Sequence, residues 1–427
     1  MTMNGINEWI RHGFDVVMTA TFALSAVYFL LTILTILLRR RKTPSELVAP
    51  AEFPRVTVQI PTYNELAALN CAGRCLAFDY PADRLQILIG DDSNKPEISA
   101  QIDAFAAEHP GLQVCRRGNN AGFKPGNLNH MLKQTAGDYI LILDSDFLPE
   151  KDFLRRLVQP VIKDPTLAGV QASWRITNVH QNHTTLMGAG IINVIHIVIL
   201  PFIKRFAHAG VFCGSAELIR KDLLIQNGGW TPGTLTEDVD YSLRVIASGG
   251  HIAYLEDLYC TCEVPYTPRD LFRQQMRWAY GVMRAFMNHG RKLLLSRLTR
   301  TRTKLAAICF GGGYIMVACF ILTTLFGILN IASAWGLDAV GSPYTFTDMA
   351  IETAGNFLLT CGMLISSLCA SFITGVSLRN VGKLALASLT IGLVLIFFVG
   401  KGLFKAALGL PMQWFMVRKN GNAVAAA

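Results

Sequence analysis

Acidic residues stand where apolar segments of the chain end. Asp144 and Asp146 follow one apolar run, and Asp91 and Asp92 close another. Two carboxylates two positions apart can converge once the chain leaves a strand, and such oxygen ligands suit Mg²⁺ or Mn²⁺ holding a diphosphate. The alternative for Asp144 and Asp146 alone is a pair of solvated loop carboxylates. Asp91 and Asp92 can accept hydrogen bonds from a base or a ribose.

Two further groups could act on a phosphorylated ligand. Lys124 lies in a glycine-rich loop that opens a predicted helix, where backbone N–H groups and an ammonium can both face phosphate oxygens. Asp238 falls in the first turn of another predicted helix, after Thr236 as a candidate N-cap. A carboxylate there could serve as a general base. Taken alone, it also fits an acidic first helical turn without a catalytic role.

A basic stretch follows over residues 266–304. It contains ten Lys and Arg residues and a single acid, Asp270, and therefore carries the whole formal net charge of +9. Its aromatic and apolar residues predict an amphipathic helix against lipid headgroups, and flanking apolar spans argue against nucleic acid. Gln274, Arg277 and Trp278 share one helical face. Together they could bind a pyrophosphate and stack on a sugar.

The elements that position these residues alternate between strands and helices. Apolar runs at 55–60, 85–90 and 139–143 each lead into a polar cluster, with helical stretches at 66–78 and 97–109 between them. This alternation predicts an α/β domain with a mainly parallel sheet. Ligands of such sheets bind beyond the carboxyl ends of the strands, so the clusters should meet in one crevice. No Gly-x-Gly-x-x-Gly follows the first strand and no P-loop motif occurs, which argues against a dinucleotide dehydrogenase and a P-loop enzyme.

Composition places part of the chain in a membrane. The 427 residues are 51% hydrophobic and only 16% charged, whereas soluble domains carry about 25% charged residues. Apolar stretches at 14–38, 305–335, 351–375 and 384–399 each predict a span. The basic residues 39–42 place the following region in the cytoplasm, although four spans and the basic residues after the last one conflict about the side of the C-terminus.

In chain order, Asp91-Asp92, Asp144-Ser-Asp146, Thr236-Glu-Asp238 and Gln274-Gln-Met-Arg-Trp278 resemble the D, DxD, TED, QxxRW signature of family-2 processive glycosyltransferases. This group includes cellulose, hyaluronan, poly-N-acetylglucosamine and mannan synthases. The resemblance covers residues 55–290 and the flanking spans. It implies an α/β GT-A fold joined to a helical transmembrane domain, a UDP-sugar donor, and Mg²⁺ or Mn²⁺.

The resemblance also implies a role for each matching residue. Contacts to the uridine would come from Thr62, Tyr63, Glu65, Asp91 and Asp92. Lys124 would bind the diphosphate, Asp144 and Asp146 would hold the metal, and Asp144 would also bind the donor sugar. Asp238 would deprotonate the acceptor. The acceptor and pyrophosphate would be held by Phe212, Cys213, Gly214, Gln274, Arg277 and Trp278. The family's Q-x-R-W is replaced here by Gln171-Ala-Ser-Trp174.

These features predict a membrane-embedded, inverting, processive polysaccharide synthase of the bacterial inner membrane. It would polymerise a hexose from a UDP-sugar, with UDP-glucose as the first choice, and move the polysaccharide across the membrane. Membrane lipids and accessory secretion proteins are the expected partners, besides donor and acceptor. The predicted divisions are an anchor (residues 1–42), a cytoplasmic catalytic domain (43–264), interface helices (265–304) and C-terminal spans (305–427).

Two alternatives remain open. A non-processive enzyme of the same chemistry would transfer one sugar to a membrane lipid, and product length distinguishes it. A transporter or nucleotide sensor belongs to a different class. Transporters keep ionisable residues inside their spans, and the predicted spans are nearly free of them, while no catalytic carboxylate of the signature is missing.

Overall fold

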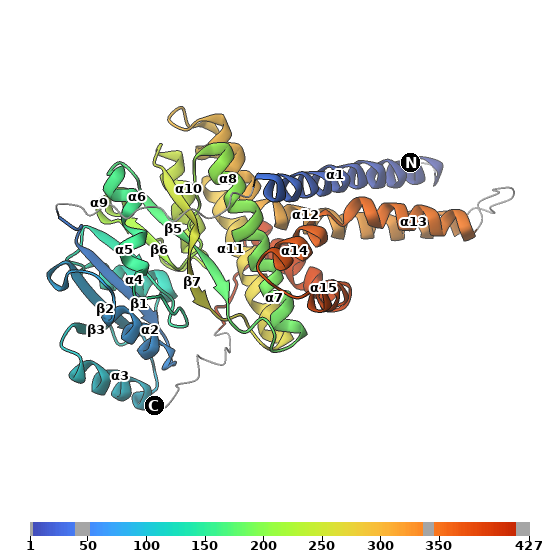
Figure 1. Cartoon of the computed structure of the whole chain (residues 1–427). Coiled ribbons are helices and arrows are strands. Elements are labelled where there is room, and N and C mark those ends of the chain that lie inside the picture. Colours follow the sequence, from blue (N-terminus) through green and yellow to red (C-terminus); the bar gives the residue numbers. More distant parts are fainter. Residues whose placement is uncertain (1–2, 39–51, 336–345, 416–427) are drawn as a thin grey trace.

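The computed structural model describes residues 3–38, 52–335 and 346–415. An α/β part built on one sheet lies on one side, and long apolar helices extend from it on the other (Figure 1). The basic residues 39–42 and the basic pair near the C-terminus, which entered the topology prediction, lie outside the described residues.

The sheet has seven strands in the order β3-β2-β1-β4-β6-β5-β7. The strands are β1 (Val56–Thr62), β2 (Leu85–Asp91), β3 (Leu112–Arg116), β4 (Tyr139–Ile142), β5 (Gly169–Ile176), β6 (Glu217–Arg220) and β7 (Ile252–Cys262). Only β6 runs antiparallel to its neighbours β4 and β5; the other pairings are parallel. The predicted mainly parallel α/β sheet is therefore confirmed, with all three predicted strands present as β1, β2 and β4.

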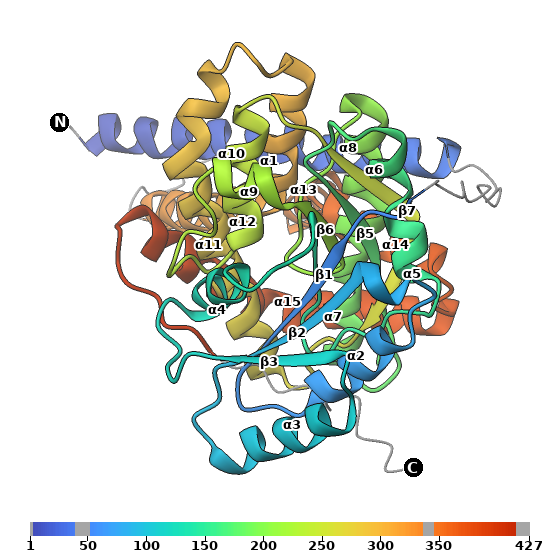
Figure 2. The same cartoon turned by 90° about the vertical axis from the view of Figure 1, so that its left-hand side faces the viewer.

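Helices cover both faces of this sheet, as Figure 2 shows. Ile140 and Ile142 pack toward α4 and α10, whereas Leu141 faces α2 and α5. Burial on both faces explains why these strands read as continuous apolar runs. The helices and short turns of this part are α2 (Ala67–Leu76), η1 (Ala82–Arg84), α3 (Pro96–Glu108), α4 (Phe123–Leu132), α5 (Phe153–Leu157), α6 (Gln159–Lys163), α9 (Lys221–Gln226) and α10 (Glu237–Ala247).

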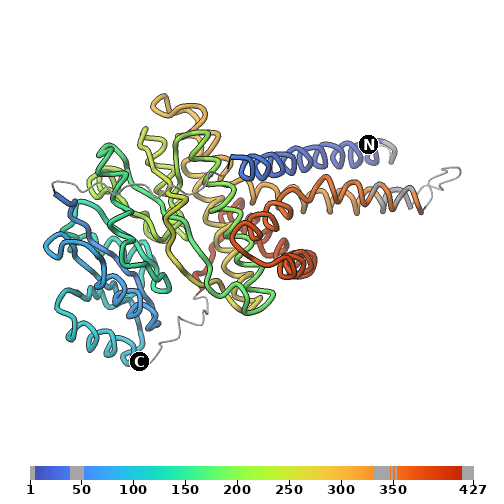
Figure 3. Tube along the Cα trace, in the orientation of Figure 1, coloured from blue at the N-terminus to red at the C-terminus, as the bar shows by residue number. Residues whose placement is uncertain are grey.

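Four of the described helices are long and apolar enough to cross a membrane, or up to five if one bent pair forms a single span. Those that match predicted spans are α1 (Met3–Leu38), α12 (Thr301–Trp335), α15 (Leu378–Ala407) and the pair α13 (Phe346–Thr360) and α14 (Gly362–Ile373), bent by 52°. The predicted short span at 384–399 is wrong in length, because α15 begins earlier and ends later. Helices α1 and α12, far apart in sequence, lie side by side (Figure 3).

The sequence prediction missed one apolar run, formed by α7 (His183–Asn193), the π-helical turn η2 (Val194–Ile199) and α8 (Leu200–Ala207). Within this run, 72% of the most apolar window is buried inside the protein. It crosses α1 in both views instead of running alongside it. The run therefore packs between the sheet and the long helices.

Most of the basic stretch forms α11 (Pro268–Leu295), and its end forms the connection to α12 and the first turn of α12. Part of the apolar side of α11 is buried within the protein, at Leu271, Met276, Ala279 and Val282, whereas Leu294 and Leu295 at its end are exposed. Helix α11 packs against both α10 and α15, and it thereby links the helix that carries Asp238 to one of the long apolar helices.

Candidate active site

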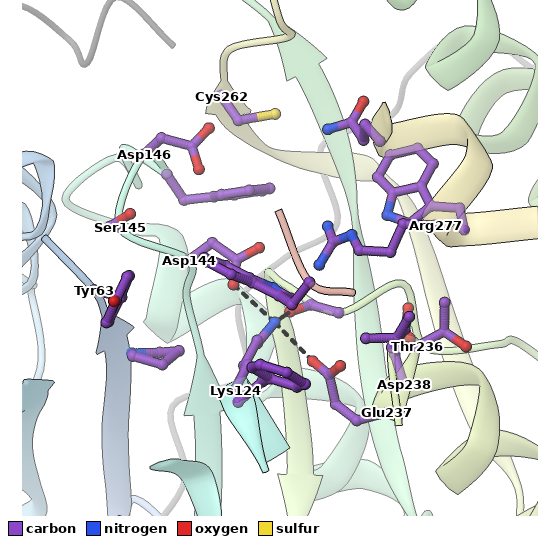
Figure 4. A pocket seen from close by; sticks show the side chains of 18 of the residues that line it. Tyr63, Lys124, Asp144, Ser145, Asp146, Thr236, Glu237, Asp238, Cys262 and Arg277 are labelled. Atoms are coloured by element: carbon purple, nitrogen blue, oxygen red, sulfur yellow. Dashed lines mark hydrogen bonds and ion pairs between the residues drawn. The ribbon is translucent and has the colours of Figure 1, made fainter. Parts of the chain in front are cut away.

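A pocket opens at the carboxyl ends of β1 and β4, and α4, α10 and α11 supply its other walls (Figure 4). The predicted residues that line it are Thr62, Tyr63, Glu65, Asp92, Lys124, Asp144, Asp146, Cys213, Gly214, Asp238, Gln274, Arg277 and Trp278. The carboxyl ends of β1, β2 and β4 thus meet the first turns of α4 and α10 at this pocket, as expected for a parallel sheet.

Two predicted residues do not line the pocket. The Asp91 side chain is fully buried, and its carboxylate accepts from the Ser93 backbone N–H, Ser99 and Arg116. Phe212 is also fully buried and stacks on Tyr241 in the core. Neither side chain reaches the pocket, because both are committed to internal contacts, and their predicted ligand contacts stay predictions.

Asp92 lines the pocket but is held from within the protein. Arg117 donates to both of its carboxylate oxygens, with an Nε–Oδ1 distance of 2.8 Å. The same guanidinium donates to the carbonyls of Ala121 and Phe123. Asp92 thus anchors, through Arg117, the loop that leads into α4, and the first turn of α4 places Lys124 at the pocket.

Lys124 connects the two acidic motifs. Its Nζ lies 2.7 Å from Asp144 Oδ1 and 2.8 Å from Glu237 Oε1, and it donates to the Gly214 carbonyl at 2.5 Å. Burial disfavours the ammonium, but the charges of Asp144 and Glu237 prevail and raise the pKa of Lys124. The bridge leaves one positive charge where the DxD and TED motifs meet, and sequence alone does not show this contact.

Asp238 lies beside this bridge, in the first turn of α10. Thr236 precedes the helix as predicted, but its side chain makes no capping hydrogen bond. Burial, and then the charge of Glu237, raises the pKa of Asp238 to about 7. A carboxylate with a pKa near neutrality is well matched to proton transfer at physiological pH.

Asp144 and Asp146 are the residues that could hold a metal. They flank Ser145 on the loop after β4, and the Asp144 backbone N–H donates to the Ser215 hydroxyl at 2.9 Å. Among the described residues, no group of three or more His, Cys, Asp or Glu side chains could hold a metal ion. A metal here would thus have two carboxylates, with diphosphate oxygens and water completing its shell. Mg²⁺ commonly binds in this way, so the residues present fit such an ion.

Arg277 supplies a second positive group from α11. Its Nε is buried and has no hydrogen-bond partner within the described ranges. Desolvation lowers its pKa, while the charges of Glu237, Asp144 and Asp238 favour the guanidinium form. A guanidinium that lines the pocket with an unpaired donor is suited to an oxyanion such as a diphosphate.

Several lining residues were absent from the predicted set. Phe123 adopts a left-handed conformation, with φ of 55°, and lines the pocket. Trp414, from the segment after α15, stacks on Phe123 with centroids 6.2 Å apart and meets the Tyr63 ring edge-on. Trp174, in the segment that departs from Q-x-R-W, also lines the pocket. Trp174 lies in the segment that replaces Q-x-R-W and Phe123 lies beside Lys124 in the glycine-rich segment, so both stood next to positions that the sequence had already indicated.

A buried charge network joins α10 to α11 behind the pocket. Asp240 is 2% exposed and accepts from Thr231 Oγ1 at 2.9 Å and Arg244 Nε at 3.0 Å. On α11, His289 Nε2 lies 2.7 Å from the other Asp240 carboxylate oxygen. The network therefore holds the helix of Asp238 in register with the helix of Arg277.

Asp240→Ala is expected to destabilise the folded chain by about 3–5 kcal/mol, because it leaves the buried Arg244 without its counter-charge. Tm in detergent should fall by roughly 5–15 °C. The matched control is Asp222→Ala, which removes a carboxylate that is 54% exposed and paired with Arg220, and it should cost less than about 1 kcal/mol. Equal Tm values for Asp240→Ala and the native chain would contradict a structural role for the network.

Residues 54–281, more than half of the chain, match the protein family described as Glycosyltransferase like family 2. The chain belongs to this family. The family-2 glycosyltransferase resemblance predicted from the four motifs is therefore confirmed. Glucomannan 4-beta-mannosyltransferase 2 of Arabidopsis thaliana is 31% identical over 272 residues, which cover 62% of this chain and 51% of that protein.

A second relative and one solved structure extend the comparison. Probable glucomannan 4-beta-mannosyltransferase 9 of Oryza sativa subsp. japonica is 32% identical over 266 residues, covering 60% of this chain and 50% of that protein. The chain thus spans about half the length of the curated relatives it matches. The mannosyltransferase PcManGT from Pyrobaculum calidifontis, solved with GDP-Man and Mn²⁺, aligns with a TM-score of 0.61 at 20% identity, over 86% of this chain and 98% of that one. This likeness confirms the GT-A fold of the family-2 chain.

Proposed function

We propose that this family-2 glycosyltransferase is a membrane-embedded, inverting β-mannosyltransferase that extends a β-linked glycan from GDP-mannose. The single observation that carries the chemistry is the pocket in which Lys124 bridges Asp144 and Glu237 beside Asp238. The donor is inferred from the relatives, which are named as glucomannan mannosyltransferases, and from PcManGT, which was solved with GDP-Man. GDP-mannose therefore replaces UDP-glucose as the first choice.

The reaction needs a base for the acceptor hydroxyl and positive charge that stabilises the nucleoside diphosphate leaving group. Asp238 takes the proton of the acceptor hydroxyl, whose oxygen forms a bond to the anomeric carbon while the bond from that carbon to the diphosphate oxygen breaks. Arg277 and Lys124 supply positive charge for the departing nucleoside diphosphate. A divalent cation held by Asp144 and Asp146 would, when bound, offset the remaining charge.

The walls of the pocket support separate places for donor and acceptor. Tyr63, Phe123 and Trp414 form an aromatic group on the side of β1 and α4, where a nucleobase could stack. Trp174 and Trp278 line the same pocket from β5 and α11. Indole rings are suited to stacking on a sugar, so we assign this side to the acceptor. Gln274 is buried next to Arg277 on α11 and is assigned to the pyrophosphate.

We also propose that the catalytic part is cytoplasmic, at the inner membrane, and that the corner between α11 and α12 contacts lipid. Leu294, Leu295 and Leu298 are 55%, 69% and 74% exposed there. Exposed Arg291 and Arg297 lie in the same segment, directly before the apolar helix α12. Leucines beside basic side chains fit an anionic headgroup layer. Activity in nanodiscs with and without anionic lipid tests this contact.

Incubating the purified full chain with Mn²⁺ or Mg²⁺ and a panel of GDP- and UDP-sugars should release nucleotide fastest with GDP-mannose. We expect a preference of at least about tenfold over UDP-glucose, since a mismatched base leaves polar groups of the site unpaired. Sizing of the radiolabelled product separates a polymer from the alternative, a single mannose on a membrane lipid. Faster turnover of UDP-glucose would overturn the donor assignment, and a product with one sugar would overturn processive synthesis.

A further inference from the structure

Glu217, at the start of β6, is a buried acid with no role in the proposed chemistry. Its side chain is 0% exposed, and within the described ranges its Oε1 has no hydrogen-bond partner. It lies opposite Ile142 of β4 and Gln171 of β5 in the sheet. With Ile142 and Ile219 it shares the sheet face that packs toward α10. An unpaired acid in this position is costly, which calls for a functional explanation.

The other carboxyl oxygen of Glu217 holds the turn that faces the general base. The Gly214 backbone N–H donates to Glu217 Oε2 at 2.9 Å, and the Gly214 carbonyl accepts from Lys124 Nζ. Gly214 has φ of +91°, which disfavours any residue with a side chain. A Cβ added there would lie 3.3 Å from Asp238 Oδ2. The backbone held by Glu217 is thus packed directly against the Asp238 carboxylate.

Two side chains of β5, Gln171 and Trp174, hold the backbone on either side of Gly214. Gln171 Oε1 accepts from the Cys213 N–H at 2.8 Å, and its Nε2 donates to the Ser215 carbonyl at 2.9 Å. Trp174 Nε1 donates to the same carbonyl at 3.0 Å. Gln171 and Trp174 thus hold the Ser215 carbonyl, Gln171 also holds the Cys213 N–H, and Glu217 alone among these three side chains bonds Gly214, the residue packed against Asp238.

The charged and titratable groups near Glu217 come from α4, α10 and the turn before β6. They are Lys124 of α4, Cys213 of the turn, and Glu237, Asp238 and Tyr241 of α10. Desolvation, and then the charge of Asp238, raises the pKa of Glu217 well above that of a free glutamate. An uncharged Glu217 and a glutamine have nearly the same shape and charge. Both can accept a hydrogen bond from Gly214.

We propose that Glu217 is a positioning residue for Asp238 and that it acts by fixing the Gly214 turn against the base. Because its carboxyl group is fully buried and its Oε1 is unpaired within the described ranges, Glu217 does so in the uncharged form. The proposal rests on the function proposed above, in which Asp238 takes the acceptor proton. Glu217 touches neither substrate nor reacting atoms, and its effect passes through the Gly214 N–H. Loss of this acceptor should displace the turn and thereby Asp238, whereas the donor site around Arg277 and Asp146 should be little affected.

The test compares Glu217→Ala and Glu217→Gln in the full-length enzyme, with the preferred nucleotide sugar from the donor panel. We expect Glu217→Ala to lower kcat by about 10- to 100-fold, as misplacement of a reacting group does, with little change in the donor KM. Glu217→Gln should restore most of kcat, and the acidic limb of its pH profile should stay in place. The matched control is Gln59→Ala, which removes a fully buried polar side chain of β1 that lies outside the pocket.

Each outcome decides the proposal. Full activity of Glu217→Ala overturns it, as does Glu217→Gln being as slow as Glu217→Ala. A shift of the acidic limb to lower pH in Glu217→Gln also overturns it, because removal of an anionic neighbour would lower the pKa of Asp238. If Glu217→Ala does not fold, Glu217→Gln and its pH profile still decide. Asp238→Asn is measured in parallel. If Asp238→Asn stays active, the assignment of Asp238 as the base fails. If Asp238→Asn is inactive but Glu217→Ala is fully active, only the Glu217 inference fails.

Discussion

Asp238→Asn is expected to lower kcat by about 10²- to 10⁴-fold, the range that a positioned general base contributes. The amide has nearly the shape of the carboxylate, but it cannot take the proton of the acceptor hydroxyl. Because the pKa of Asp238 is raised to about 7, chiefly by burial, the native enzyme should lose kcat/KM as the pH falls below that value. Protonation of the carboxylate removes the base, so the loss lies on the acidic side.

Nucleotide release measured between about pH 5.5 and 9 checks both expectations. The acidic limb should be present in the native chain and absent from the residual activity of Asp238→Asn. The control Asp152→Asn makes the same change, from a carboxylate to an amide, at a position outside the pocket. Its activity and pH profile should match those of the native chain. Full turnover by Asp238→Asn would remove Asp238 from the mechanism and direct attention to Glu237, the other acid of that helical turn.

Removal of divalent metal is expected to lower turnover by about 10³-fold or more, because the diphosphate leaving group then departs without its counter-charge. Asp146→Asn should have a similar effect at low metal concentration, since the site has few protein ligands. Asp146 is the cleaner position to change, because Asp144 also pairs with Lys124. A weakened site should recover partly when Mn²⁺ is raised, and this recovery is the diagnostic measurement.

The control for this experiment is Asp83→Asn, whose side chain is 79% exposed and lies outside the pocket. Its metal dependence should match that of the native chain. Turnover of the native chain that persists after chelation would contradict a metal requirement. An Asp146→Asn variant with the native affinity for Mn²⁺ would instead move the metal away from Asp146.

Much of the fold was predictable because it depends on local patterns. Strands buried on both faces read as unbroken apolar runs, and polar turns mark their ends, so β1, β2 and β4 were recognised from sequence. The α7–η2–α8 run was missed because it lies within the region predicted as one cytoplasmic domain, and only its packing shows an apolar helical run buried between the sheet and the long helices. The buried part of the apolar side of α11 was assigned to lipid because burial inside a protein and burial in lipid select the same apolar residues.

For the candidate site, too, the motifs were predictable from sequence, whereas the orientation of individual side chains was not. Sequence by itself determined which motifs belong to the pocket, because the carboxyl ends of parallel strands meet at one edge of a sheet. It could not distinguish Asp92, which lines the pocket, from Asp91, which is bonded to Arg116 inside the fold. Neighbouring residues in a chain can point in opposite directions, so adjacency does not establish a role.

Sequence therefore determined the fold class, the family and the set of motifs, since these follow from residue types and their spacing along the chain. Only the tertiary structure decided the contacts between segments: the Lys124 bridge between Asp144 and Glu237, and the Glu217 hydrogen bond behind Asp238. Charges and hydrogen bonds act over a few ångströms. Residues that lie far apart in the chain shift one another's pKa and act together only when folding brings them within that range.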